Sequence, residues 1–330
     1  MTLRDELTAL VDDLVPEISG EGCSPESLWE NMVELGLPVV GISESKGGSG
    51  GSLEDLSVLA EALGAKGTST PLIEATVANW VLAEAGEPFA DGRNTVTIAE
   101  PAGRHDELFA VPWAQNAARL VVVWPDSTPG IARVDIPGTV VPGFTLAEEP
   151  SDTVRLGATA VRQLDNGPSA TAIRSRLGLL RSAALSGALR GTYAATRSHV
   201  RTREQFGAPL IEIPAVAHAL ATMKTHLLQV QTAVDRAVGA ATEDPLDAAP
   251  VVHAVAAARV IAASAAGEAA RIAHQLHGAI GITQELALHQ LTTRLWVWRD
   301  ADLPASHWAA QLGEAAITGG EASVWHELTA

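Results

Sequence analysis

The sequence predicts a mainly α-helical protein with a small β-domain between two helical regions. The 330-residue chain is 47% hydrophobic but weighted towards alanine, with one Tyr and four Phe, a composition typical of closely packed helices. Segments between residues 94 and 167 are rich in β-branched residues, whereas residues from 168 onwards carry long apolar stripes at helical spacing. We therefore expect an N-terminal helical domain at 1–93, a shortened β-domain at 94–167 and a C-terminal helical bundle at 168–330.

The first domain is expected to consist of short helices. Leucines recur at helical spacing from residue 3 to residue 14. Ser24 followed by Pro25 is a favourable helix start, because Ser caps free N–H groups and Pro suits the first helical position, and Gly36 ends that helix. The glycine run at 47–51 lacks both the lysine of a phosphate loop and the spacing of a dinucleotide loop, so we expect a turn there. Further helices are expected at Leu53–Leu63 and Ile73–Ala85.

The β-domain and the bundle are predicted from a change in periodicity. Four segments bounded by Pro, Gly or Asp have strand character: Thr95–Ala99, Leu120–Trp124, Ile131–Ile136 and Val154–Val161. After Asn166-Gly167-Pro168 the apolar residues alternate by three and four, as in the core of a bundle. Four or five helices are expected there, beginning near Ser169, Pro214, Pro250, Glu285 and Pro304, with the last ending at Gly319-Gly320.

Composition excludes several classes of protein. A net charge of −17 argues against general nucleic-acid binding. Cys23 is the only cysteine, which excludes a disulfide framework within the chain and fits a reducing cytoplasm. No uninterrupted apolar run reaches the roughly 18 residues of a membrane span, and the N-terminus has no apolar signal core. We therefore expect a cytoplasmic protein with no membrane partner.

Basic residues concentrate in one stretch of this acidic chain. Between Asn166 and Gly207 there are seven arginines and one acid. Arginines are good helix formers on a solvated face, but a guanidinium also matches the geometry of phosphate. A second segment, Gln275–Gly281, contains two glycines that allow a ligand to approach closely, although by itself it is also a typical helix end.

The histidines give no metal-binding pattern. His274 and His277 lie three residues apart, and His253 lies upstream. No carboxylate or cysteine stands at a matching spacing, so we expect helical or interface histidines and no metal site.

Several landmarks resemble those of the acyl-CoA dehydrogenase family. Arg203–Leu210 is similar to the family's Arg-x-x-Phe-Gly-x-Pro-Ile/Leu segment. Gln275–Gly281 is similar to its Gln-x-x-Gly-Gly-x-Gly segment, with Ala279 in place of the second glycine. Glu34–Leu37 and Gly47–Gly50 are similar to its Glu-Leu-Gly-Leu and Gly-Gly-x-Gly landmarks. The resemblance implies an N-terminal helical domain, a middle β-barrel-like domain and a C-terminal four-helix bundle.

In this family FAD is shared across a subunit interface, and the resemblance implies which residues contact it. Each subunit offers its Arg-x-x-Phe-Gly and Gln-x-x-Gly segments to the ADP half of an FAD whose flavin half is held by another subunit. The corresponding cofactor-binding residues of this chain are Arg203, Gln205, Phe206, Gln275, Gly278 and Ala279.

The chain departs from the family where the catalytic base and the flavin are held. One family position for the base corresponds to Leu177-Gly178, and no Asp or Glu occurs from Asn166 to Arg203. The other lies in a Glu-Gly-Thr loop, whose counterpart Arg299–Pro304 offers only Asp302 near the right register. Thr97–Gly103 retains only part of the flavin-binding segment Thr-Glu-Pro-x-x-Gly-Ser-Asp.

This asymmetry resembles the shortened, base-lacking subunit of heterotetrameric acyl-CoA dehydrogenases of actinobacterial steroid degradation. The resemblance implies a flavoprotein complex that desaturates an acyl-CoA thioester, with a steroid side-chain CoA ester as one candidate substrate. Its partner would be a full-length homologue that carries the catalytic glutamate. Two alternatives remain open: a self-sufficient homo-oligomeric dehydrogenase with Asp302 as base, and a flavin-free structural scaffold.

Overall fold

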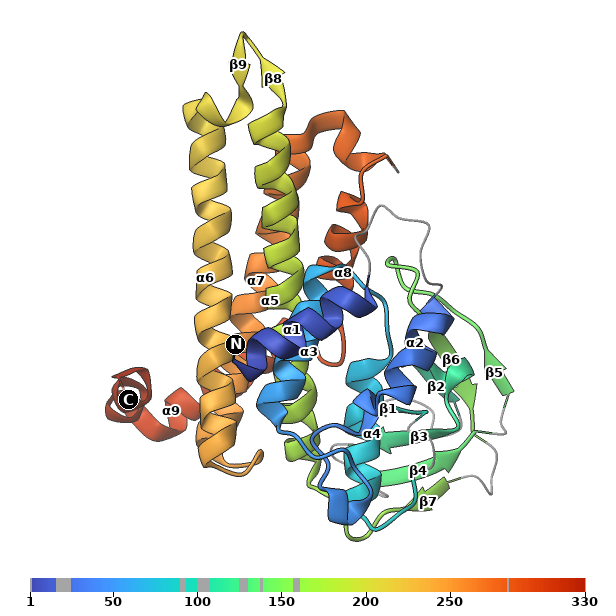
Figure 1. Ribbon diagram of the computed structural model, residues 1–330. Coiled ribbons are helices and arrows are strands. Elements are labelled where there is room, and N and C mark those ends of the chain that lie inside the picture. Colours follow the sequence, from blue (N-terminus) through green and yellow to red (C-terminus); the bar gives the residue numbers. More distant parts are fainter. Residues whose placement is uncertain are drawn as a thin grey trace. The chain divides into compact units, whose positions relative to one another are not determined.

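The computed structural model describes residues 2–15, 25–89, 93–99, 107–124, 130–136, 139–156, 161–283 and 285–329. The chain divides into two compact units. Unit 1 comprises Met1–Pro16, Glu21–Leu59 and Ser69–Leu180, and unit 2 comprises Glu17–Gly20, Ala60–Thr68 and Arg181–Ala330. Helices predominate, and the two larger sheets lie in unit 1 (Figure 1). The predicted fold class is confirmed. The three predicted domains divide the chain differently from these two units, and the three-domain division stays a prediction.

Short helices open unit 1, as the apolar spacing predicted. They are α1 (Leu3–Leu14), α2 (Pro25–Glu34), α3 (Leu53–Ala65) and α4 (Leu72–Glu84). The residues of α3 from Ala60 onwards belong to unit 2. The 3-10 helices η1 (Leu37–Val39) and η2 (Glu44–Lys46) lie between α2 and α3 in the chain. Thr2 and Asp5 form a reciprocal capping box at the start of α1, with N···O distances of 2.8 and 3.2 Å. The predicted cap Ser24, like Cys23, lies outside the described residues.

The glycine run at 47–51 forms the predicted turn between η2 and α3. Gly50 has a φ of 72° and donates its N–H to the carbonyl of Ile42 at 2.9 Å. A Cβ on Gly48 would overlap the backbone of Ile42. Close backbone packing therefore explains these glycines without a bound phosphate.

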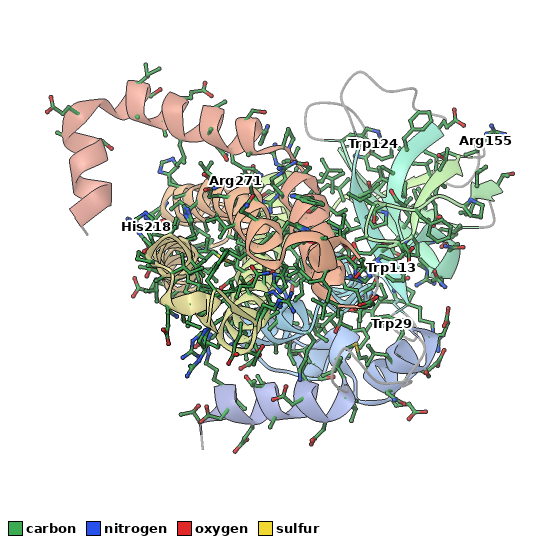
Figure 2. The ribbon with its side chains drawn as sticks, turned by 90° about the horizontal axis from the view of Figure 1, so that it is seen from above. Trp29, Trp113, Trp124, Arg155, His218 and Arg271 are labelled. Carbon is green, nitrogen blue, oxygen red and sulfur yellow. The ribbon has the colours of Figure 1, made fainter. Side chains whose placement is uncertain are left out.

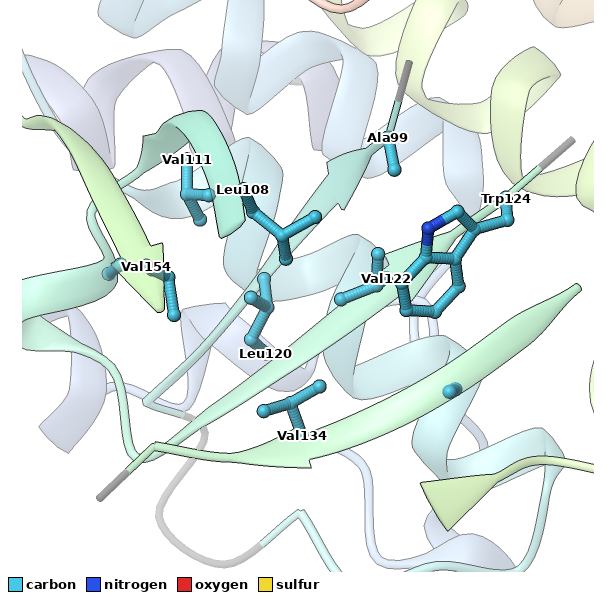
Figure 3. Close-up of a cluster of buried hydrophobic side chains, with 10 residues drawn as sticks. Ala99, Leu108, Val111, Leu120, Val122, Trp124, Val134 and Val154 are labelled. Atoms are coloured by element: carbon cyan, nitrogen blue, oxygen red, sulfur yellow. The ribbon is translucent and has the colours of Figure 1, made fainter. Parts of the chain in front are cut away.

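Two small sheets form the β region of unit 1. One has the strand order β1-β3-β4-β7 and contains Asn94–Ile98, Arg119–Val123, Ile131–Asp135 and Val161–Gln163. The other has the order β2-β6-β5 and contains Glu107–Pro112, Ser151–Arg155 and Thr139–Val141. β1 and β3 pair in parallel, and the other pairs are antiparallel. Both sheets contribute to one buried core, which includes Leu108, Val111, Leu120, Val122, Trp124, Val134 and Val154 (Figure 3).

The sequence pattern did not predict β2 or β5. In β2 the register shifts between Leu108 and Val111, and Ala110 has a φ of 53°. This bulge interrupts the alternation of buried and exposed side chains and leaves Phe109 65% exposed. β5 has only three residues, and none of them is buried. The single strand predicted at Val154–Val161 is instead divided between β6 and β7.

Long helices form the bundle. They are α5 (Ala170–Thr202), α6 (Pro214–Glu243), α7 (Ala249–His277), α8 (Leu288–Asp300) and α9 (Ala305–Thr329). α5 begins in unit 1 and continues in unit 2. The 3-10 helix η5 (Gly278–Ile282) follows α7. The predicted seam of α6 is buried at Leu220, Met223, Leu227, Val230 and Val234. Figure 2 is turned so that the helices of unit 2 are seen from above, with exposed His218 on α6 and Arg271 on α7 labelled.

Small residues allow the helices of unit 2 to approach closely. A Cβ on Gly187 of α5 would overlap the carbonyl oxygen of Glu61, and one on Gly191 would overlap that of Ala65. The last turn of α3 therefore packs backbone to backbone against α5. This packing is the physical counterpart of the alanine-rich, aromatic-poor composition.

Two helices of unit 2 differ from the sequence expectation. The segment Ala249–Ile282 is apolar enough to cross a membrane, with a hydropathy of 1.5. However, 61% of its most apolar window is buried within the structure, as in the core helix of a bundle. In α9, non-helical angles at Gly320 interrupt the helix at its predicted end, but a further helical segment continues to Thr329.

Candidate functional site

The arginine-rich end of α5 leads into a short hairpin. β8 (Glu204–Gln205) pairs antiparallel with β9 (Ala208–Pro209) through a two-residue turn. Both turn residues have positive φ, 55° at Phe206 and 85° at Gly207, which is typical of a tight type I′ hairpin. Glycine adopts this conformation freely, but a phenylalanine there is strained by about 1–3 kcal/mol. Backbone strain of this kind is common at ligand-binding sites.

The side chains of this hairpin extend into solvent. Phe206 is 93% exposed, and Arg203 and Gln205 are also exposed. The Arg203 backbone is fixed, because its N–H donates to the His199 carbonyl and its own carbonyl accepts from Leu210, both at 2.9 Å. Within the described part of the chain, no carboxylate forms an ion pair with its guanidinium. The hairpin, which extends beyond the ends of α5 and α6 (Figure 1), therefore presents a cation and an aromatic ring on a fixed backbone.

The second predicted segment, Gln275–Gly281, lies at the end of α7. Gln275, Gly278 and Ala279 are all exposed. Gly278 has φ 64° and ψ −145°, a combination that is essentially restricted to glycine. Ala279, which replaces the second glycine of the family motif, lies where its methyl group meets solvent. The segment thus turns sharply and leaves its backbone open.

Two histidines bring these segments to the same end of unit 2. The rings of His199 on α5 and His277 on α7 stack with centroids 4.3 Å apart. Burial lowers the pKa of both rings, and the positive charge of Arg203 lowers the pKa of His199 further. Both rings are therefore neutral near pH 7 and can stack without repulsion. Arg203 follows His199 by four residues and Gly278 follows His277 directly, so the two predicted segments are neighbours.

This end of unit 2 fits a phosphate-bearing ligand with a flat ring. The Arg203 guanidinium provides a fork of donors that matches phosphate oxygens, and the Gln275 amide can donate to a further oxygen. The Phe206 ring can stack on a planar group or exclude water from it. No atom of the described residues lies within 4 Å of a notional Cβ on Gly278, so a ligand can approach its backbone. The adenosine diphosphate half of FAD has this chemistry.

Asp302, the candidate base, is held in a buried ion pair. Its carboxylate accepts from Nε of Arg181 at 2.9 Å and from Nη2 at 3.3 Å, and the two side chains are only 10% and 6% exposed. Burial acts to raise the pKa of Asp302, but the charge and hydrogen bonds of Arg181 and the charge of Arg259 outweigh it, so the pKa is lowered. A carboxylate whose ionised form is stabilised in this way is a poor proton acceptor. The geometry therefore favours a structural role for Asp302 over that of a base.

Arg259 connects this ion pair to the end of α8. Its side chain is buried and donates to the carbonyls of Trp298, Arg299 and Ala301 at 3.1 to 3.2 Å. These carbonyls belong to the last turn of α8 and to its C-cap residue Ala301, where no intrahelical donor is available. Burial lowers the pKa of Arg259 to about 10, although the charge of Asp302 opposes this. Sequence reasoning did not single out Arg181 or Arg259 for this role.

The first family position for the base contains no acid. Residues 175–180 of α5, which include Leu177-Gly178, are all buried. The remnant of the flavin-binding segment is described only as far as Ala99, the residue after β1, and Glu100–Gly103 lie outside the described residues.

His274 of α7 is held by neighbouring side chains. His274 Nε2 lies 3.0 Å from the Thr292 hydroxyl, and its ring stacks on Trp296. His277 Nδ1 lies 2.8 Å from the Ala273 carbonyl oxygen. Over the described residues, no three His, Cys, Asp or Glu side chains are grouped so that they could hold a metal ion.

Two domain profiles of one protein family match the sequence. The acyl-CoA dehydrogenase N-terminal domain matches residues 1–89, and the acyl-CoA dehydrogenase C-terminal domain matches residues 171–299. Together these ranges cover more than half of the chain. The chain belongs to the acyl-CoA dehydrogenase family.

Two similar proteins are both named Acyl-CoA dehydrogenase IpdE2. The one from Mycobacterium tuberculosis (strain ATCC 25618 / H37Rv) is 28% identical over 274 residues, which are 80% of this chain and 78% of the relative. The one from Mycolicibacterium smegmatis is 29% identical over 304 residues, which are 86% of this chain and 88% of the relative.

Solved structures of the family have the same fold. A variant of the Tcur3481–Tcur3483 steroid ACAD superposes with a TM-score of 0.82 at 25% identity, covering 96% of this chain and 98% of that one. The ChsE4–ChsE5 complex from Mycobacterium tuberculosis gives 0.80 at 21% identity, with 97% and 98% covered. Butyryl-CoA dehydrogenase from Megasphaera elsdenii gives 0.79 at 18% identity, with 96% and 99% covered. The chain therefore has the acyl-CoA dehydrogenase fold.

Proposed function

We propose that this chain is the non-catalytic subunit of a heterotetrameric acyl-CoA dehydrogenase. A contrast within the chain carries the proposal. The exposed Arg203–Phe206 hairpin and the Gly278 turn have the chemistry of an ADP-binding surface. By contrast, Asp302 is held in an ion pair, and the sequence has no Asp or Glu from Asn166 to Arg203, the stretch that contains Leu177. The chain would thus contribute to cofactor binding, while a full-length homologous subunit would supply the catalytic glutamate.

The residues at the end of unit 2 would bind the ADP half of an FAD whose flavin ring works in the partner subunit. Bound FAD supplies the hydride acceptor for desaturation at Cα–Cβ of an acyl-CoA thioester. Arg203 would bind the pyrophosphate, and Gln275 would donate to one of its oxygens. Gln205 and Phe206 would cover the nucleotide, while Gly278 and Ala279 would let it approach the backbone.

The substrate class is proposed from similarity. One of the structural relatives is described as a steroid ACAD, and its sequence is 25% identical to this chain, with 96% of this chain covered. A CoA ester of a steroid side chain, or of a fragment of similar bulk, is therefore the substrate that we propose for the complex. The cytoplasmic location indicated by composition stays a prediction.

The two alternative functions have less support. A self-sufficient dehydrogenase would need Asp302 as base, but Arg181 and Arg259 stabilise its ionised form. A flavin-free scaffold would give no reason for a strained, 93% exposed Phe206 beside Arg203.

Co-expression with a full-length homologue tests the proposal. The isolated chain should be colourless and inactive, and the purified complex should contain FAD and desaturate acyl-CoA. Arg203→Ala should weaken FAD binding by the complex by roughly 10- to 150-fold, because a hydrogen bond to a charged group contributes about 1.5–3 kcal/mol.

Arg201→Ala is the matched control for this variant. Arg201 is also exposed and lies at the same helix end, but outside the resembling motif. Flavin bound by the isolated chain, or equal loss of FAD in both variants, would argue against the assignment.

A further inference from the structure

A second unusual arginine lies near the start of α5, within unit 1. The Arg176 side chain is 4% exposed, yet its Nε and Nη2 have no hydrogen-bond partner among the residues that the structure describes. An unpaired charge buried in this way costs several kcal/mol. Buried polar groups are almost always satisfied in folded proteins, so this guanidinium calls for a partner from outside the chain.

Arg176 keeps its positive charge although its side chain is buried. Its Cζ lies 4.7 Å from the centroid of the Trp80 ring, a cation–π contact. Burial lowers the pKa of Arg176 to about 10, and the charge of Glu84 opposes this lowering. The Glu84 carboxylate is itself paired with Lys46 at 2.7 Å. Arg176 is therefore a protonated cation at neutral pH.

Gly41 packs closely against one edge of the guanidinium. Gly41 has a φ of 78°, and a Cβ at this position would lie 2.7 Å from Nη2 of Arg176 and 2.9 Å from Leu56 Cδ1. Any other residue would therefore press on the nitrogen that lacks a partner. The positive φ also favours glycine here.

The free edge of Arg176 is the one with which other arginines of this chain hold carboxylates. Arg181 binds Asp302 through Nε and Nη2 at 2.9 and 3.3 Å. Arg271 binds Glu268 through the same two atoms at 3.0 and 2.6 Å. This parallel fork matches the two oxygens of a carboxylate.

We propose that Arg176 anchors a site in unit 1 for the carboxylate of a small molecule, with the Trp80 ring beside it. The carboxylate belongs either to a free acid or to the far end of an acyl chain on coenzyme A. The site uses no residue of the FAD surface, so it stands or falls independently of the proposed function.

Thermal unfolding of the full-length chain tests this site. Saturating succinate should raise the Tm of the wild-type chain by roughly 5 °C relative to chloride at equal ionic strength. Succinyl-CoA and butyryl-CoA, which have equal chain lengths, separate the two sources. A rise with succinate indicates a free acid, and a rise with succinyl-CoA alone indicates the end of an acyl chain.

Two substitutions on the same helix provide the comparison. Arg176→Met should abolish the rise and increase the Tm without ligand, because it removes an unpaired buried charge. Arg174→Met should keep the rise, because Arg174 already donates to Thr171 at 3.3 Å. An equal rise in the Arg176→Met chain, or no rise with any of these carboxylates, overturns the proposal.

A measurement on the wild-type chain serves if Arg176→Met does not fold. The Nε–H resonance of Arg176, assigned by its loss in Arg176→Lys, should shift on addition of the carboxylate that raises the Tm. A resonance that stays unchanged at saturation overturns the proposal.

Discussion

Replacing Asp302 by Asn should destabilise this chain far more than the loss of a surface charge. Asn preserves the size of the side chain and tolerates the φ of 65° that Asp302 adopts. The substitution removes the shared counter-ion of Arg181 and Arg259, whose side chains are buried. Loss of one partner from a buried ion pair costs about 3–5 kcal/mol. Because two arginines depend on Asp302, we expect the free energy of unfolding to fall by at least the lower part of that range.

Urea denaturation followed by circular dichroism measures this change. Asp300→Asn is the control, because the Arg299–Asp300 pair is close, at 2.7 Å, but its side chains are 36% and 61% exposed. That substitution should cost less than about 1 kcal/mol. A small loss of stability in Asp302→Asn, combined with abolished turnover of the FAD-loaded complex, would refute the structural role and make Asp302 the base.

Four further outcomes are expected. The first concerns pH, because the folded pKa of Asp302 is lowered. The stabilising effect of its carboxylate should be complete above the unfolded pKa of about 3.9 and should disappear as the pH falls through the folded pKa. Denaturation curves of wild type and Asp302→Asn should therefore converge at low pH. Gly187→Ala should destabilise the chain by more than about 2 kcal/mol in the same assay, because its methyl group would overlap the Glu61 carbonyl. Gly278→Ala should lower the free energy of unfolding by about 1–3 kcal/mol through backbone strain. An unchanged urea midpoint would contradict the φ of 64° at this residue. The His277 ring, whose pKa burial lowers, should titrate below about 6.5 by NMR, and a higher value would exclude the buried stack with His199.

Long periodic segments made most of the fold predictable. The seam of α6 and the start of α2 at Pro25 follow from spacing and from proline chemistry, which are local properties of the chain. β2 was missed because its bulge at Ala110 breaks the alternation on which strand prediction depends. The further helical turns after Gly320 were missed because a glycine pair marks a break but does not show whether a helix resumes.

The candidate site was predictable only in part, for a different reason. The segments at Arg203 and Gln275 carry recognisable motifs, but their proximity depends on the stack of His199 and His277, which are 78 residues apart. The environment of Asp302 depends on Arg181, 121 residues away. That Arg176 lacks a partner is visible only in the packed structure. The helical pattern alone does not distinguish it from the other arginines between Asn166 and Gly207.

The flavin content of this chain, alone and in complex with a full-length homologue, tests the central claim most directly. Visible absorbance and native mass of the two preparations are sufficient. We predict no flavin in the isolated chain, FAD in the complex, and loss of that FAD in Arg203→Ala but not in Arg201→Ala. Stoichiometric FAD in the isolated chain, with turnover in the absence of a partner, would contradict the account.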